Sequence, residues 1–412
     1  MERCRMTIRY ASRLLERVRE SETTPLLIAT GAFRATQNMA QTTLSLLGVS
    51  LGLGSAAIGA IAAGANLVAV LTMLLITAHL STSAAQRAVY VGLLFMTASI
   101  VSFLIPAQFM LLVGALLLGV AGGLVLPSAA TAIGQRASNQ GDRTHATRGR
   151  AFATLALVLS ISLTLGPIYE SVVLSAAHEH LLAAYLAFLP IALIGARVTR
   201  QSQATTDAAP AAPASFWASM AGLGSLFRNQ KWCLAVCGQA VYMVPFSLVV
   251  VFIGLIGKSL YHIPASTTEV GIAIFFTVSF LCRVALTRWP AVGHRLRLFG
   301  VCVAATLCGI GLLAFGHGIG LFMFALAILG APHGLTYPVA LALVADAVPI
   351  EELPRANAGF QAVSNLITVA APLAFGLVID QFGDRAVLLC AAIPILPLAG
   401  LLWVLRDAGR VH

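Results

Sequence analysis

Four long polar side chains interrupt the first apolar stretch of this sequence, residues 25–51, and they carry its most distinctive chemistry. Arg34, Gln37, Asn38 and Gln41 are spaced i, i+3, i+4 and i+7, which places them on one face of an α-helix. If the helix enters a bilayer at the start of this stretch, Arg34 lies roughly 13 Å deep in a core of about 30 Å. A charge at that depth is costly and marks a functional site. We interpret the stripe as one wall of a ligand-binding cavity, since an arginine that snorkels to the surface leaves the three amides unexplained.

The composition indicates a polytopic membrane protein. Of the 412 residues, 59% are apolar and only 10% are charged, and the mean hydropathy is +0.91. Such a chain has too little polar surface for a soluble globule. The net charge of +10 is explained by basic residues in alternate loops and not by nucleic-acid binding. We interpret the seven cysteines, mostly within apolar segments, as small buried residues in preference to disulfide partners or metal ligands.

Twelve apolar runs are each long enough to cross a bilayer. We predict transmembrane helices near residues 25–51, 54–79, 87–105, 107–134, 151–175 and 181–196, and near 232–257, 266–287, 297–315, 317–345, 356–380 and 385–405. The predicted organisation is a basic amino-terminal segment, a six-helix bundle, a linker, a second six-helix bundle and a short tail, at residues 1–24, 25–196, 197–231, 232–405 and 406–412. The fold class is therefore all-α.

The basic residues predict the orientation of these helices. All Lys and Arg residues except Arg34, Lys258 and Arg385 fall on the side of the amino terminus, with Arg283 assigned to that side as well. Because Lys and Arg concentrate in cytoplasmic loops, we expect both termini and the linker in the cytoplasm. The protein is then a multi-pass component of the plasma (inner) membrane.

A three-residue pattern recurs in the predicted fourth and tenth helices. Two glycines four residues apart are followed by a proline four residues later, at one constant offset of about half the chain: Gly119, Gly123 and Pro127, and Gly330, Gly334 and Pro338. This spacing allows helices to pack closely. Its recurrence in equivalent helices predicts two parallel repeats related by an axis along the membrane normal.

The sequence resembles the major facilitator superfamily over its whole membrane portion. The strongest match covers residues 334–383, where a Glu-x-x-Arg-x-x-x-Gly loop is followed by Gly376, Asp380 and Gly383 in a Gly-x-x-x-Asp-x-x-Gly pattern. The resemblance implies two pseudo-symmetric six-helix bundles that work by alternating access. It also implies a central cavity lined by the first, fourth, seventh and tenth helices.

Two further motifs of the superfamily are only partly present. Gly166 and Pro167 in the fifth helix resemble the Gly-Pro of the drug/proton antiporters, but the glycine pair expected shortly afterwards is replaced by Glu170 and Ser171. Of the signature between the second and third helices, only the final Arg87 is retained. We expect Gly166 and Pro167 to bend the fifth helix or pack it closely, as a conformational element.

Polar stripes on other helices add candidate binding residues. They are Gln239 and Tyr242 in the seventh helix, His333 and Tyr337 in the tenth, and Gln361 and Asn365 in the eleventh. Each stripe equally fits hydrogen bonding between helices. The resemblance favours a role in the cavity for the seventh and tenth helices.

The predicted function is secondary transport of a small organic solute. The sequence contains no phosphate-binding loop and no hydrolase motif, so we expect neither an enzyme nor a cofactor or metal, and transport driven by a gradient. Glu170 lies roughly 15 Å beyond Arg34 along the membrane normal and no carboxylate is expected at the depth of Arg34. An arginine without a counter-charge favours an organic anion as substrate.

Protons are the favoured coupling ion, carried by His333 or, as the next candidate, by Glu170. The alternative function is an exporter of drugs or other lipophilic compounds, and a third is a membrane sensor that does not transport. The expected partners are the small-molecule substrate, protons and the lipid bilayer, without nucleic acid, around a monomer.

Overall fold

The computed structural model describes residues 23–77, 80, 82–139, 145–201, 223–288, 295–349 and 352–405. Every regular element within these residues is a helix, as the sequence predicts. The basic amino-terminal segment, the carboxy-terminal tail and most of the predicted linker lie outside the described residues.

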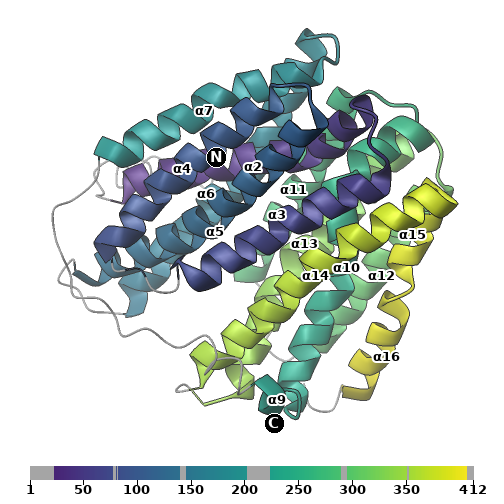
Figure 1. Cartoon of the computed structure of the whole chain (residues 1–412). Helices are drawn as coiled ribbons and strands as arrows, with labels where there is room; N and C mark the ends of the chain where they lie inside the picture. Colours follow the sequence, from purple (N-terminus) through teal and green to yellow (C-terminus); the bar gives the residue numbers. More distant parts are fainter. Residues whose placement is uncertain are drawn as a thin grey trace, which may run out of the picture.

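Two bundles of helices stand side by side and converge at one end (Figure 1). The amino-terminal bundle contains α2 (Thr24–Ser50), α3 (Ser55–Leu75), α4 (Thr82–Phe103), α5 (Gln108–Asn139), α6 (His145–Ala176) and α7 (Leu181–Gln201). The carboxy-terminal bundle contains α9 (Leu223–Leu226), α10 (Gln230–Leu260), α11 (Ala265–Arg288), α12 (Arg295–Phe315), α13 (Ile319–Ala347), α14 (Leu353–Phe382), α15 (Asp384–Ala392) and α16 (Ile395–Val404). We call the end at which α2 begins the inner end and the opposite end the outer end, after the predicted orientation.

Eleven spans among the described helices are long and apolar enough to cross a membrane, and α2 is not one of them. This helix has 27 residues, which suffices for a bilayer. Its mean hydropathy is lowered by the polar stripe that begins at Arg34. Among the predicted membrane helices, α2 is thus the one that apolar composition alone does not identify as a span, and it carries predicted binding residues.

The last predicted helix, residues 385–405, is divided in the structure. α15 ends at Ala392, and α16 begins at Ile395 with Pro394 as its N-cap. Proline has no amide hydrogen to continue the helical hydrogen bonds, so the break falls where the sequence places this residue. The two pieces together form one span, Asp384–Val404.

The repeated glycines bring equivalent helix pairs into backbone contact. A Cβ atom on Gly119 of α5 would lie 2.3 Å from the carbonyl oxygen of Ala65 in α3, and one on Gly330 of α13 would lie 2.3 Å from that of Phe275 in α11. The following glycines, Gly123 and Gly334, meet the carbonyl groups one turn further along α3 and α11. The sequence repeat therefore corresponds to one packing motif used in both bundles.

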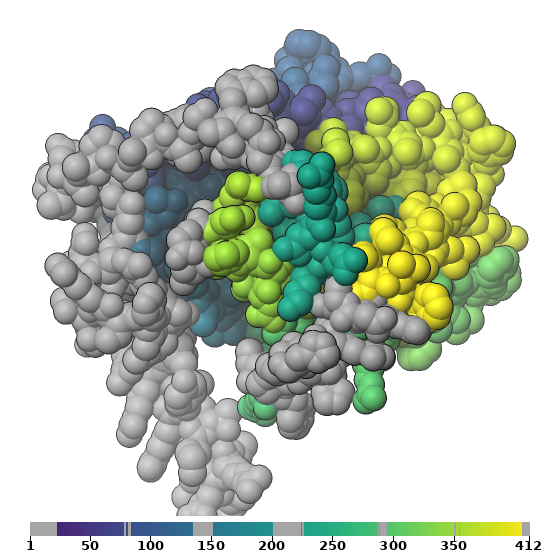
Figure 2. All heavy atoms as spheres, turned by 90° about the horizontal axis from the view of Figure 1, so that it is seen from below, coloured from purple at the N-terminus to yellow at the C-terminus, as the bar shows by residue number. Residues whose placement is uncertain are grey.

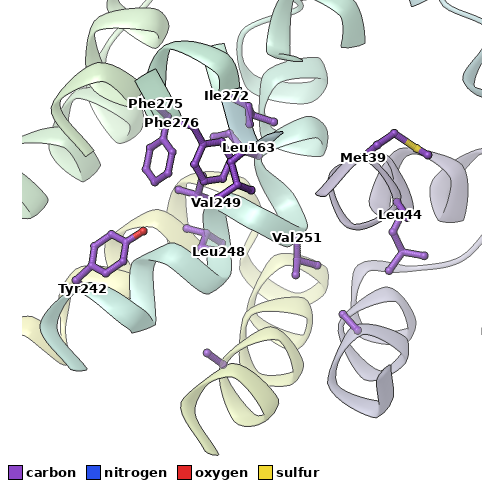
Figure 3. Packing of buried hydrophobic residues seen from close by; sticks show 14 of the residues in the cluster. Met39, Leu44, Leu163, Tyr242, Leu248, Val249, Val251, Ile272, Phe275 and Phe276 are labelled. Carbon is purple, nitrogen blue, oxygen red and sulfur yellow. The ribbon is translucent and has the colours of Figure 1, made fainter. Parts of the chain in front are cut away.

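The two bundles meet along three helix pairs: α3 packs on α14, α6 on α11 and α2 on α10. Apolar side chains fill these contacts. Figure 3 shows Leu163 of α6 next to Ile272 and Phe276 of α11, and all three are buried. In the same view Val251 of α10 lies on the side of its helix that is turned toward Leu44 of α2.

The Gly-x-x-x-Asp-x-x-Gly pattern joins the bundles at the outer end. Gly376 of α14 lies against the backbone of Ser55, where a Cβ atom would be 2.3 Å from the carbonyl oxygen. Asp380 accepts hydrogen bonds from the backbone N–H groups of Ser55 (2.7 Å) and Ala56 (2.9 Å). It supplies the first turn of α3 with a carboxylate cap, which suits the positive end of the helix. Gly383 has φ of +85° and ends α14.

A second carboxylate cap crosses between the bundles in the opposite direction. Glu179, in the connection between α6 and α7, accepts a 2.9 Å hydrogen bond from the backbone N–H of Ser266 and another from its hydroxyl group. Ser266 lies in the first turn of α11. Each bundle thus caps one helix of the other, and both caps lie at the outer end.

Elements of the carboxy-terminal bundle are tied together at the inner end. The side chain of Asn229 donates to the carbonyl group of Ala347 (2.7 Å), and the Trp232 indole donates to that of Ala356 (3.0 Å). The starts of α10 and α14 accordingly lie side by side in the view of Figure 2.

The glycine packing can be tested by adding one methyl group. Gly330→Ala should lower the melting temperature of the detergent-solubilised protein, because overpacking of this kind costs about 1–3 kcal/mol. Gly311→Ala in α12 is the matched control, since no heavy atom lies within 4 Å of a Cβ atom there. It should leave the melting temperature unchanged or raise it slightly, because alanine favours a helix over glycine by about 1 kcal/mol. Equal melting temperatures for the two variants would contradict the close packing of α13 on α11.

Candidate functional site

A cavity of about 330 Å³ lies between the two bundles. The polar stripe of α2 forms one wall of it, with all four predicted residues in the lining: Arg34, Gln37, Asn38 and Gln41. Facing residues of α14 include Gln361 and Asn365, as predicted, together with Thr368. The structure therefore brings six of the ten predicted binding residues together around one space.

The remaining walls of the cavity are mostly apolar. Ala62, Ala65 and Ala69 come from α3, and Phe246 and Val250 come from α10. Small side chains on α3 leave the space open, while α10 closes it with larger ones. The cavity consequently has a polar face, made by α2 and α14, and an apolar face.

Amide side chains organise the polar face. Gln37 accepts a 2.7 Å hydrogen bond from Nη1 of Arg34, which the i, i+3 spacing on one helix allows. Gln361 donates to the side chain of Asn365 (3.1 Å). Asn66 of α3, which sequence reasoning missed, donates to the carbonyl group of Thr368 in α14 (2.7 Å). Amide groups on three helices are thus held at fixed positions around the cavity.

A second arginine, Arg283 of α11, lies near Arg34. The two guanidinium groups are close enough to repel each other electrostatically. The hydrogen bonds of Arg283 are long, 3.3 Å to the Ser160 hydroxyl and 3.4 Å to the carbonyl group of His333, and its Nε has no partner. The assignment of Arg283 to the inner side by the count of basic residues is wrong: this side chain points between the bundles.

Neither arginine is neutralised by a carboxylate in the part of the chain that the structure describes. The ion pair recorded there joins Arg295 and Asp346, two exposed or partly exposed residues remote from the cavity. Two positive charges, one from each bundle, therefore interact with no carboxylate among the described residues to balance them, and of the two only Arg34 is in the cavity lining.

His333 lies in an aromatic enclosure outside the lining of the cavity. Its ring centroid is between 4.8 and 5.4 Å from those of Tyr242, Phe246, Phe275 and Phe276. Nδ1 is 2.7 Å from the hydroxyl group of Ser279 in α11. Contacts with rings from α10 and α11 make His333 a packing element at the centre of the carboxy-terminal bundle, beside Arg283.

Three further predicted residues also lie outside the cavity lining. Gln239 and Tyr242 are buried in α10, where the Gln239 Oε1 atom and the Tyr242 hydroxyl group have no hydrogen-bond partner among the described residues. Tyr337 is 40% exposed and packs against Phe360 of α14 with ring centroids 6.1 Å apart. None of the three is in the cavity lining, although the Tyr242 ring centroid lies 5.3 Å from that of Phe246, which is in the lining.

Gly166 and Pro167 lie within α6 where this helix crosses α2. A Cβ atom on Gly166 would come within 3.3 Å of the Cα and Cβ atoms of Ala35, the residue after Arg34. Pro167 lies inside the helix, where it removes one backbone hydrogen bond. The pair therefore brings α6 against the part of α2 that carries Arg34.

Two carboxyl groups face each other between the bundles, beyond the cavity toward the outer end. Glu170 of α6 is fully buried, and Glu269 of α11 is 3% exposed. Their side chains lie within hydrogen-bonding reach of each other. The Thr43 hydroxyl group donates to Oε1 of Glu170, and Thr43 follows Arg34 by nine residues, or about 13 Å along the helix. Glu170 and its distance from Arg34 were predicted from the sequence, whereas Glu269 was not.

A family model described as the Major Facilitator Superfamily matches residues 26–318 and 261–411. The chain belongs to this superfamily. Its members include transporters of known structure that share the fold of this chain at low sequence identity, so the likeness establishes the architecture. The search of curated protein sequences finds no match.

Three solved structures illustrate the likeness to other transporters. A point mutant of the nucleoside transporter NupG is 15% identical, with a TM-score of 0.76 over 93% of this chain and 100% of its own. A bacterial homolog of the human lysosomal transporter Spinster, inward-facing and unoccupied, is 11% identical, with a TM-score of 0.71 over 96% of this chain and 99% of its own. A POT family transporter in complex with a thioalcohol-conjugated peptide is 11% identical, with a TM-score of 0.72 over 93% of this chain and 96% of its own.

The unbalanced charge of this superfamily member can be tested without any ligand. Gln37→Glu should raise the melting temperature of the protein, because a carboxylate at this position would pair with Arg34, and hydrogen bonds to charged groups contribute about 1.5–3 kcal/mol. Gln361→Glu is the matched control, since Gln361 lines the same cavity but bonds to an amide. It should lower the melting temperature, because the carboxylate loses the donor of this hydrogen bond and sets its oxygens against the side-chain oxygen of Asn365. Equal decreases in both variants would contradict an unpaired cation at Arg34.

Proposed function

We propose that this superfamily member transports a small organic anion across the membrane by alternating access, coupled to protons. The observation that carries the proposal is the electrostatic interaction between Arg34 and Arg283, one from each bundle, with no carboxylate paired to either among the described residues. A bound carboxylate or phosphate group supplies the missing negative charge. A guanidinium group can hold such an anion with two parallel hydrogen bonds.

The cavity favours an amphiphilic anion over a purely polar one. A volume of about 330 Å³ is at the small end of the range for ligand sites. The anionic group would bind at Arg34, while the amides of Asn38 and Gln41 bind neighbouring polar atoms. The apolar side, including Phe246 and Val250, would cover the hydrocarbon part of the solute.

Because Arg34 and Arg283 belong to different bundles, a bound anion can change how strongly the two bundles attract each other. Arg34 moves with the amino-terminal bundle and Arg283 with the carboxy-terminal bundle. Their repulsion opposes approach of the bundles when the site is empty, and an anion between them reverses the sign of this interaction. A ligand can drive a conformational change only through such a difference in interaction between states.

Protons remain the proposed coupling ion, with Glu170 favoured over His333 as the carrier. His333 is held among four aromatic rings and bonds to Ser279, which supports a role in packing. Glu170 lies between the bundles, where the two change their distance during alternating access. We further propose, from the count of basic residues, that both termini face the cytoplasm.

Substitution of the arginines should weaken binding in a graded way. A panel of small organic carboxylates and phosphates is first screened by thermal shift, since a ligand at a hundred times its Kd stabilises by about 2.7 kcal/mol. For a ligand found in this way, Arg34→Lys should bind at least about tenfold more weakly, because an ammonium group lacks the planar fork of a guanidinium. Arg283→Gln should also weaken binding. Arg197→Gln, at an exposed position near the end of α7, is the control and should bind normally.

The result that would refute anion binding is an Arg34→Ala protein with unchanged affinity for its ligand. That outcome would favour the alternative function, export of uncharged lipophilic compounds through the apolar side of the cavity. Uptake by reconstituted protein separates either transporter from a sensor.

Pro167 should affect turnover more than binding. Pro167→Ala restores a backbone hydrogen bond in α6 and stiffens the helix that lies against Ala35. We expect slower transport with nearly unchanged affinity in reconstituted vesicles. Loss of affinity with a normal rate for the bound substrate would contradict this conformational role.

A further inference from the structure

Glu170 and Glu269 form a buried acidic pair that the anion site does not use. One belongs to α6 of the amino-terminal bundle and the other to α11 of the carboxy-terminal bundle. Burial of a carboxylate without a partner is costly, and here two are buried together. The pair therefore requires a chemical explanation.

The hydrogen bonding around the pair indicates what is missing. The Oε1 atom of Glu170 accepts from Thr43, and Thr42 lies within hydrogen-bonding reach of Glu269. The Oε2 atoms of both carboxyl groups have no donor from any other described residue. Because ionised carboxylates only accept, a hydrogen bond between Glu170 and Glu269 needs a proton on one of them.

The surroundings provide no cation, among the described residues, that could replace this proton. The other titratable group that interacts with Glu170 is the Tyr185 phenol of α7, which is buried and without a hydrogen-bond partner for its hydroxyl group. From α2 the pair faces threonines, and Arg34 lies about 13 Å away along that helix. Within the part of the chain that the structure describes, a proton is thus the cation left to join the two carboxyl groups and relieve their repulsion.

We propose that Glu170 and Glu269 share one proton across the two bundles, and that this proton holds the outer end closed. With the proton in place, a hydrogen bond joins α6 to α11. When the proton leaves, two carboxylates from opposite bundles repel each other, as close pairs of like charges do in other proteins. Loss of the proton would therefore favour separation of the bundles at the outer end.

This glutamate pair would couple proton binding to the conformational change of the transporter. Protonation closes the outer end, and deprotonation opens it, so proton uptake is tied to one step of alternating access. The inference rests on the proposed function for its biological use. Its test needs no substrate, so a failure here would remove the proton site and leave anion binding at Arg34 untouched.

Pulsed EPR distances across the outer end test the proposal directly. Spin labels carried by non-canonical amino acids at His180 and Lys258 leave the native cysteines in place. Both positions are exposed, lie on opposite bundles and line the same outer groove. In the full-length protein in lipid nanodiscs, the distance should lengthen as the pH rises from about 5 to about 9, a range above the titration of exposed carboxyl groups in which buried carboxyl groups lose their protons.

Two single variants should abolish this response. In Glu170→Gln or Glu269→Gln the amide group donates permanently to the remaining carboxyl group, so the short distance should persist at every pH. Asp380→Asn is the matched control, because Asp380 also joins the bundles at the outer end but through the first turn of α3. It should lengthen the distance at all pH values and keep the pH response.

Either of two outcomes would overturn the proposal: a wild-type distance that does not change with pH, or glutamine variants that respond as the wild type does. If the variants do not fold, infrared spectroscopy of the wild-type protein remains decisive. The carbonyl band of a buried protonated carboxylic acid should be present at low pH and disappear as the distance lengthens. Absence of that band at every pH would also refute the shared proton.

Discussion

Two half-buried positive charges without a negative partner among the described residues constrain this protein more than any other feature. Arg34 and Arg283 lie near each other on opposite bundles, and burial of unpaired charge is expensive in a membrane. The cost is partly offset by neutral groups: Gln37 accepts from Arg34, and Ser160 accepts from Arg283. Complete compensation requires an anion. In our proposal the transported solute is that anion. The positive charges that destabilise the empty site then give the site its affinity for the solute.

The two bundles are joined by contacts that can be made and broken as units. At the outer end, Asp380 and Glu179 each cap a helix of the opposite bundle. Glycines such as Gly119 and Gly330 place helices of one bundle in backbone contact, and Gly376 does the same between α14 and α3 across the outer end. Close backbone packing resists deformation, whereas a cap is lost by a small rigid-body displacement. If the bundles move as whole units around the cavity, the two caps and the Gly376 contact separate together, and the glutamate pair lies between the bundles at the same end.

The sequence predicted most of the fold and one half of the site. Twelve apolar runs and a repeated glycine pattern identified the helices and their symmetry, and the spacing from Arg34 to Gln41 identified one cavity wall. Arg283 was missed because it lies close to a predicted helix end, where a basic residue normally marks the cytoplasmic side. Glu269 was missed because its significance depends on Glu170, on a helix far away in sequence. Periodicity reveals which residues share a face of one helix, but not which faces meet.

A double-mutant cycle on Arg34 and Arg283 tests the central claim most directly. The affinity of an anionic ligand is measured for the wild type, Arg34→Gln, Arg283→Gln and the double variant. If both charges act on one bound anion, the second substitution should cost clearly less than it does alone, with a coupling energy of at least about 0.5 kcal/mol. Losses of binding free energy that simply add would mean that the two arginines act independently, and the account of a shared anion site would be contradicted.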